Sequence, residues 1–240
     1  MSLYLMKPPQ EKPTTFDRYA GDYAALIQDP IRKQFAVSDR FFFEQKVHII
    51  RRFFRAAGIQ SENLGWLDIG CGQGDLLYAG RPYFKSAVGC DPSEGMLQAC
   101  MGLDVRKQQS SDKLPFDDAS FDFITIVCVF HHVQQHERPR LTREALRVLK
   151  PGGYFCVIEH NPWNPVTRLI VSRSPVDADA RLLSAQKVCH LLLGAKSRIL
   201  ATHYFLIFPE AIHRYFGRIE DMLSWLPFGG QYAVFARRST

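Results

Sequence analysis

The sequence predicts an α/β fold in which a mostly parallel β-sheet is covered by helices on both faces. Short apolar segments that suit buried strands (GWLDIG, SAVGCD, DVRKQ, FDFITIVCVF and GGYFCVIEH) alternate with helix-like segments at 75–80, 93–101 and 137–149. Such alternation is typical of βαβ units, whose strands run parallel and are buried on both faces. No apolar run approaches the roughly 20 residues that cross a bilayer.

Both ends of the chain add further elements. Apolar residues recur at helical spacing over 39–57, and Gly58 follows as a stop signal. Past the fifth strand the alternation of strand-like and helix-like segments stops, and we expect Asp177 to cap a helix that runs to about residue 194. The segment SRILATHYFLIF then suits a strand, 210–226 an aromatic-rich amphipathic helix, and QYAVFARR a last strand.

Charge and cysteine usage restrict the class of protein. The chain carries 30 Lys and Arg against 24 Asp and Glu, with 10 against 7 in residues 1–65, 12 against 14 in 66–180 and 8 against 3 in 181–240. A basic flank can attract an anionic substrate, a membrane surface or nucleic acid, or can be a solvated face. The six cysteines show no CxxC pairing, and the N-terminus lacks the order of a secretory signal. We therefore expect free thiols and a cytoplasmic protein.

The strongest chemical motif is the run WLDIGCGQGD at 66–75, where a strand leads into a glycine-rich turn and a helix. Glycines permit a tight turn and let backbone N–H groups approach a ligand. A dinucleotide enzyme needs GxGxxG, with pyrophosphate on the helix N-terminus. Here the spacing is GxGxG, and Asp68 would place negative charge beside that phosphate. S-adenosylmethionine (SAM) has no phosphate and carries a sulfonium and an ammonium, so the motif favours SAM.

A second motif, GCDPS at 89–93, ends the next strand with Asp91. A carboxylate there can accept hydrogen bonds from both ribose hydroxyls of an adenosine group. Taken alone, Asp91 could equally bind the ribose of NAD or cap the helix that starts near Ser93.

Together these residues resemble the class I SAM-dependent methyltransferases, in particular the branch that methylates quinones and small molecules. The resemblance covers roughly 60–160 through LDIGCGQG, GCDPSEGML, LPFDDASFD and EALRVLKPGG, and FDRYAGDY at 16–23 is similar to the family's N-terminal cover element. It implies a Rossmann-like seven-stranded sheet with one antiparallel strand at 231–238.

The resemblance also implies a division of the chain. We expect a flexible arm at 1–13 and a single methyltransferase domain at 14–240. Within it, 14–58 forms N-terminal cover helices, 59–160 the SAM-binding core, and 161–240 the substrate-side elaboration with the last strands.

The cofactor-binding residues follow from the matched motifs. The glycine turn is expected to line the methionine end, Asp91 to hold the ribose, and Met96 to pack on the adenine. The family has Asp or Asn four residues before the leucine of LPF, where this chain has Ser110, so the adenine contact is open between a serine hydroxyl and Asp112. The full expected set is Tyr23, Asp68, Gly70, Cys71, Gly72, Asp91, Pro92, Met96, Ser110, Ser111 and Val127.

His160 is the catalytic candidate, because it follows the fifth strand at the sheet edge where open α/β sheets bind ligands. Its ordinary pKa of about 6.5 suits a general base, although a capping role in the loop is the alternative. His131, His132 and His136 lack the H-E-x-x-H order of a zinc helix, so no metal is expected.

The predicted activity is methyl transfer from SAM to a small apolar or amphipathic acceptor, because the C-terminal third is aromatic and basic. This composition leaves peripheral contact with a membrane open. A tRNA or protein methyltransferase is an alternative supported by the basic flanks, but no recognition module for nucleic acid is present. A non-catalytic SAM- or nucleotide-binding regulator is the other alternative, which the intact glycines oppose.

Overall fold

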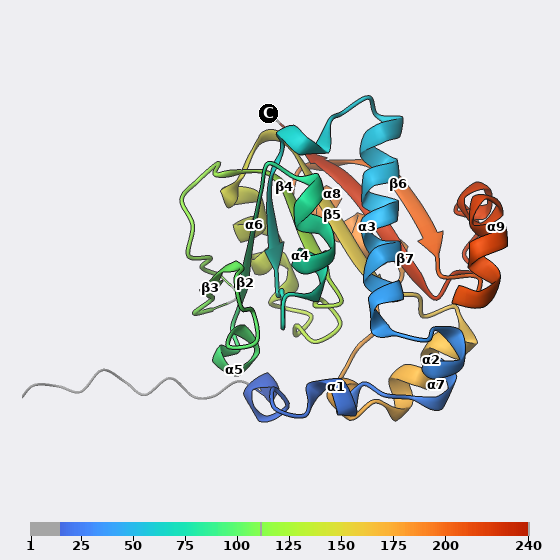
Figure 1. The fold of residues 1–240 in the computed structure, drawn as a ribbon. Helices are drawn as coiled ribbons and strands as arrows, with labels where there is room; N and C mark the ends of the chain where they lie inside the picture. The colour runs from blue at the N-terminus through green and yellow to red at the C-terminus, as the bar shows by residue number, and fades with distance from the viewer. Residues whose placement is uncertain (1–14, 111, 240) are drawn as a thin grey trace, which may run out of the picture.

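Seven strands form one sheet in the order β3-β2-β1-β4-β5-β7-β6 (Figure 1). The computed structural model describes residues 15–110 and 112–239. The strands are β1 (Gly65–Ile69), β2 (Ser86–Asp91), β3 (Asp104–Lys107), β4 (Phe121–Val127), β5 (Leu149–His160), β6 (Ser197–Phe205) and β7 (Gln231–Arg238).

One strand runs against the rest. β1, β2, β3, β4 and β5 pair in parallel, whereas β7 is antiparallel to both β5 and β6. The antiparallel strand coincides with the segment 231–238 expected from the sequence. The prediction of a Rossmann-like, mostly parallel seven-stranded sheet is confirmed.

Helices cover both faces of the sheet, and each face has its own apolar core. Phe54 of α3 packs with Trp66 and Phe123 on one face, and Val188 of α8 packs with Ile126 on the other. The α-helices are α1 (Tyr23–Leu26), α2 (Pro30–Phe35), α3 (Asp39–Ala56), α4 (Asp75–Gly80), α5 (Glu94–Leu97), α6 (Arg138–Val148), α7 (Pro165–Arg173), α8 (Ala185–Gly194) and α9 (Glu210–Leu223), and the 3₁₀ helices are η1 (Thr15–Arg18), η2 (Ser61–Asn63), η3 (Arg81–Tyr83) and η4 (Pro175–Asp177).

The largest departure from the predicted elements lies between β5 and β6. The helix expected from Asp177 begins only at Ala185, where the Ser184 hydroxyl accepts a hydrogen bond from the Lys187 N–H at 3.4 Å. Asp177 lies in η4 instead, because its carboxylate faces two histidines that follow β4. A helix that the sequence did not predict, α7, precedes it.

Two further predictions can be placed. All six cysteines are free thiols, as predicted. In the described part of the chain, no helix is both long and apolar enough to cross a membrane. The predicted flexible arm at 1–13 lies outside the described residues.

The parallel strands β1, β2, β4 and β5 end at the same edge of the sheet, which is where parallel α/β sheets bind ligands. The chain from η1 to α2 runs along this edge in Figure 1. Candidate functional groups should therefore be sought between these strand ends and the N-terminal segment.

Candidate functional site

The turn after β1 depends on glycine conformations. Gly70, Gly72 and Gly74 have φ of +73°, +54° and +83°, a region that other residues rarely adopt. A Cβ on Gly70 would lie 2.4 Å from the Val129 side chain, whereas nothing lies within 4 Å of the Cβ position of Gly72. Gly72 therefore faces open space, while Gly70 packs tightly beneath the turn.

Asp91, at the end of β2, fastens this turn to the neighbouring strand. Its carboxylate accepts hydrogen bonds from the Gly72 N–H at 2.9 Å and the Ser93 N–H at 2.8 Å. Burial raises the pKa of Asp91, and these bonds oppose the rise. The exposed Pro92 follows it, and Met96 is buried in α5. Each Asp91 oxygen accepts one of these bonds and keeps a further lone pair for a ligand hydroxyl.

Asp68, in β1, is a buried carboxylate held by a hydroxyl. Its Oδ1 accepts a hydrogen bond from the Thr125 hydroxyl at 2.6 Å, and that hydroxyl accepts one from the Trp66 indole at 2.8 Å. Burial raises the pKa of Asp68 to about 7. Among the described residues no cation forms an ion pair with it, although the charge of Lys46 opposes the rise in its pKa.

Lys46 is a functional candidate that the sequence interpretation missed. This lysine of α3 is 5% exposed, and its ammonium lies 4.6 Å from the centroid of the Phe43 ring. Burial lowers its pKa, while Asp75 and Asp68 act in the opposite direction. Within the described chain it makes no ion pair or hydrogen bond. The available signal was its position: Lys46 falls on the apolar face of the predicted helix.

The N-terminal segment contacts the same turn. Asp17 accepts hydrogen bonds from the Ser93 hydroxyl at 2.7 Å and the Gly95 N–H at 3.1 Å. The Gln73 amide donates to the Ala20 carbonyl at 3.0 Å. These contacts hold the segment across the strand ends.

Tyr23 begins α1 and is half-buried. Burial raises the pKa of its phenol, and Cys128 and Asp177 add to the rise. The phenol therefore lies within electrostatic reach of Cys128, which follows β4, and of Asp177 in η4.

The loop residues expected beside the adenine are Ser110, Ser111 and Asp112. The Ser110 hydroxyl donates to the Asp112 carboxylate at 2.7 Å, and both side chains are exposed. The two residues expected to compete for the adenine contact are thus bonded to each other. Ser111 lies outside the described residues. Cys71 is buried in the turn and Val127 half-buried at the end of β4.

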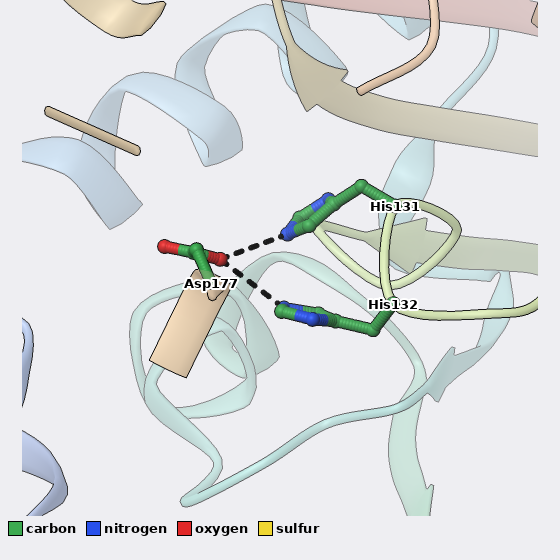
Figure 2. Close-up of side chains that lie close together, drawn as sticks. All are labelled: His131, His132 and Asp177. Atoms are coloured by element: carbon green, nitrogen blue, oxygen red, sulfur yellow. Dashed lines mark ion pairs between the residues drawn. The ribbon is translucent and has the colours of Figure 1, made fainter. Parts of the chain in front are cut away.

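Glu159, fully buried near the end of β5, organises the other half of the edge. One carboxylate oxygen accepts the N–H groups of Val129 and Phe130 at 3.1 and 2.7 Å, and the other lies 2.5 Å from His131 Nδ1. His131 Nε2 lies 3.4 Å from Asp177 Oδ1, and His132 Nε2 lies 3.3 Å from the same oxygen (Figure 2). Two histidines and two carboxylates thus form one cluster.

The charges in this cluster are unequal. Burial favours neutral His131, but Glu159 and Asp177 outweigh it and raise the pKa of His131 to about 9. Burial lowers the pKa of His132 to about 4, and the neighbouring His131 lowers it further. Burial opposes ionisation of Asp177, yet its hydrogen bonds and the histidines lower its pKa to about 2. At neutral pH, His131 is a cation between two anions, and His132 is neutral.

This cluster is also the group that could hold a metal ion. His131, His132 and Asp177 offer ligand atoms within 4.8 Å of one another, whereas the exposed His136 is not among them. A metal ligand must be a deprotonated imidazole. Because the pKa of His131 is about 9, its proton would have to be displaced.

His160 ends β5 beside this cluster. Its ring centroid lies 5.2 Å from that of His131, and its Nδ1 lies 3.5 Å from the Gln231 amide nitrogen. Burial, reinforced by His131, lowers the pKa of His160 to about 3. The Gln231 amide oxygen is buried and has no hydrogen-bond partner among the described residues.

A cavity of about 630 Å³ reaches the cluster between α7 and η4. Asp177 belongs both to the cavity wall and to the histidine cluster. The volume falls within the roughly 300–1,000 Å³ of small-molecule sites. Its lining mixes apolar and polar side chains: Pro165, Arg168, Leu169, Val171, Ser172, Asp177, Ala178, Ala180 and Leu182.

Comparisons with known proteins agree with this arrangement. A protein-family model described as a methyltransferase domain matches residues 67–157. The uncharacterized methyltransferase YcgJ of Bacillus subtilis (strain 168) is 36% identical over 109 residues, 42% of this chain and 42% of that protein. A demethylmenaquinone methyltransferase of Symbiobacterium thermophilum is 33% identical over 116 residues, 43% of this chain and 45% of that protein. The matches thus span less than half the length of these relatives.

The fold is shared over nearly the whole chain. The crystal structure of a SAM-dependent methyltransferase from Thermotoga maritima, described as a possible histamine N-methyltransferase, matches with a TM-score of 0.65. The alignment covers 93% of this chain and 98% of that one at 20% identity.

The cluster predicts a specific titration. His131 should stay protonated up to about pH 9, measurable from its ring signals by NMR. Because this pKa lies above the roughly 6.5 of an unfolded chain, the stabilisation is complete below that pH and is lost as pH rises through about 9. Glu159→Gln should lower the His131 pKa and flatten this pH dependence of unfolding.

Glu144→Gln is the matched control. Glu144 is also a largely buried carboxylate that accepts a backbone N–H, but it belongs to α6 and pairs with Arg147. The Glu144→Gln variant should lower the free energy of unfolding without changing the pH at which the His131 ring signals titrate. A His131 ring that titrates at the same pH in the wild type and in Glu159→Gln would contradict the assigned cluster.

Proposed function

We propose that this protein transfers the methyl group of SAM to a small, amphipathic acceptor. Residues 67–157 match a model of a methyltransferase domain, and the fold is Rossmann-like. The observation that carries this proposal is a pair of buried, opposite charges at the glycine turn. Neither Asp68 nor Lys46 forms an ion pair among the described residues, yet each acts on the other's pKa through its charge. Together they complement the ammonium and carboxylate of an amino acid.

The remaining cofactor contacts follow from the same edge. Gly72 leaves open space beside the turn, and Asp91 keeps lone pairs for ribose hydroxyls. A pyrophosphate would meet both buried carboxylates, which opposes a dinucleotide. The N-terminal helices would cover this side, and residues 161–239 would build the acceptor side.

The acceptor class rests on the cavity between α7 and η4. Its walls combine Leu169 and Val171 with Arg168 and Asp177, a lining that suits a molecule with an apolar body and a polar end. The similarity to a demethylmenaquinone methyltransferase over the core supports an acceptor of this kind.

Bound SAM supplies an activated methyl group, so the chain's main task is to position the acceptor and exclude water. The histidines His132 and His160 are weak bases, with pKa values of about 4 and 3. They suit an acceptor whose proton becomes acidic as it is methylated. We assign His160 to contact the reacting end of the acceptor, because its ring lies beside the histidine cluster that meets the cavity at Asp177.

The activity is tested by transfer of labelled methyl from SAM into extract fractions separated into lipid, small molecules, RNA and protein. We expect label in the lipid or small-molecule fraction. His160→Ala should lower turnover by about 10²-fold or more while SAM affinity is retained. The matched control is His136→Ala, which removes an exposed histidine.

Other outcomes have distinct meanings. Label in RNA or protein would overturn the acceptor class, and no label in any fraction despite SAM binding would favour a regulator. Chelator treatment should leave transfer unchanged. Loss of transfer that a divalent cation restores would reassign His131, His132 and Asp177 as metal ligands.

The buried lysine gives a second prediction with opposite effects on binding and stability. Lys46→Met should weaken SAM binding by about 1.5–3 kcal/mol, roughly tenfold or more, because a charge-assisted contact is lost. Replacing an unpaired buried ammonium with an apolar chain should leave the free energy of unfolding unchanged or higher. Calorimetry and urea unfolding measure the two effects.

Lys33→Met, on the exposed side of α2, is the control and should change neither quantity. Equal SAM affinity for the wild type and Lys46→Met would show that Lys46 does not contact SAM. A stability loss alone would make it a structural residue.

Asp68 gives a third prediction. Its pKa of about 7 means that the carboxylate is mostly protonated at pH 6 and mostly ionised at pH 7.5. Only the ionised form attracts an ammonium, so SAM affinity should rise by up to about one order of magnitude over this interval. Calorimetry in buffers of different ionisation enthalpy should also detect proton release. Asp68→Asn should bind SAM weakly at both pH values. A variant with the wild-type pH profile would show that Asp68 does not bind the SAM ammonium.

A further inference from the structure

Helix α9 is attached to the protein by its polar side. Its acidic residues all turn inward: the Glu220 carboxylate accepts the N–H groups of Leu206, Ile207 and Phe208 at 2.9, 3.2 and 2.9 Å. Asp221 pairs with Arg52 at 2.5 Å, and Glu210 accepts the Val37 N–H at 2.7 Å. Charge-assisted hydrogen bonds hold this helix in place, together with ring contacts of His213 with Phe41 and of Phe216 with Phe208.

The apolar side of α9 consequently faces solvent, the reverse of an ordinary surface helix. Glu220 is the one residue of the helix that is buried. Apolar residues recur at i, i+3, i+4 and i+7, and the chain that follows the helix extends them. We call these residues the outer strip: Ile212, Tyr215, Phe216, Ile219, Met222, Trp225 and Phe228, which are between 43% and 76% exposed.

Basic groups flank the outer strip. Arg214 and Arg218 are exposed, and within the described residues neither forms an ion pair. The Arg214 guanidinium lies 4.5 Å from the centroid of the Tyr215 ring. Because the carboxylates of α9 face the protein, the outward face of the helix combines aromatic and aliphatic side chains with positive charge alone.

The turn that follows the helix joins the outer strip to α7. The Asn164 amide donates to the Phe228 carbonyl at 2.8 Å, and Asn161 donates to the carbonyls of Pro227 and Gly229. Trp163, 69% exposed, lies next to these asparagines. Another exposed aromatic residue therefore adjoins the strip at the start of the helix that lines the acceptor cavity.

We propose that the outer strip docks the protein on an anionic lipid membrane. Amphipathic helices that lie in a bilayer interface have aromatic and aliphatic residues on one face and Arg or Lys beside it. Trp and Tyr favour the level of the lipid headgroups, and arginine is attracted to anionic ones. Docking is a property of the surface and does not depend on the proposed methyl transfer.

The dimensions favour a membrane over a second copy of the chain. A helix of 14 residues is about 21 Å long and about 10 Å wide, so its face covers on the order of 200 Å². A stable protein interface needs about 800 Å² on each partner. Figure 1 shows α9 at the outer edge of the molecule beyond β6, where it projects from the helical layers.

The test is flotation of the full chain with vesicles of phosphatidylcholine alone or mixed with an equal part of phosphatidylglycerol. We expect binding to the mixed vesicles, weakened by salt, and little binding to the neutral ones. Ile219→Glu and the pair Arg214→Gln with Arg218→Gln should each reduce the bound fraction by about tenfold or more. Met101→Glu, which adds the same charge at an exposed apolar residue outside the strip, should bind as the wild type does.

Trp225 provides an independent readout. Its emission should shift to the blue on binding, and Trp225→Phe should remove most of the shift. Melting temperature and SAM affinity, measured without lipid, should be the same in all these variants, so loss of docking is distinguished from loss of the fold or of the cofactor site.

Three outcomes would overturn the proposal. They are absence of binding to the mixed vesicles at low salt, equal binding to both vesicle types, and binding that Ile219→Glu leaves intact. A dimer in sedimentation that Ile219→Glu dissociates, without vesicle binding, would assign the outer strip to self-association instead.

Discussion

The path of the chain beyond β4 and β5 depends on one buried carboxylate. Glu159 lies near the end of β5, between β4 and β7, and is fully buried, an environment that disfavours a charge. It is stabilised because it accepts the N–H groups of Val129 and Phe130 and faces a protonated His131. Since these three donors are consecutive, Glu159 determines the path of the chain after β4, where Cys128 adopts a positive φ of 56°.

The consequences extend to a segment far along the chain. With His131 held from one side, its other nitrogen and that of His132 face the same oxygen of Asp177. This contact fixes η4, forms the end of the cavity, and delays the start of α8 until Ala185. The cavity and the charge cluster therefore meet at Asp177.

The cofactor half follows a different principle. There, Asp91 joins the glycine turn to the next strand, whereas Asp68 and Lys46 are left without partners of opposite charge in the described chain. Unpaired buried charges cost stability, and proteins keep them chiefly where function needs them. The two halves meet where the N-terminal segment crosses the strand ends, with Phe16 against the His132 ring at 4.9 Å.

The sequence by itself determined the strands and the glycine turn, because strand periodicity and glycine conformations are local properties. The antiparallel direction of 231–238 was expected only from the resemblance to the methyltransferase family. The apolar spacing of α9 was also visible, but not the direction in which it faces. Only the tertiary structure decided that Asp177 contacts His131 and His132. It also placed Lys46 within electrostatic reach of Asp68 without an ion pair. Finally, it directed Glu220 toward the protein, so that the apolar side of α9 faces solvent. Each of these is a charge or hydrogen-bond contact between distant segments, and such contacts leave no periodic trace in the chain.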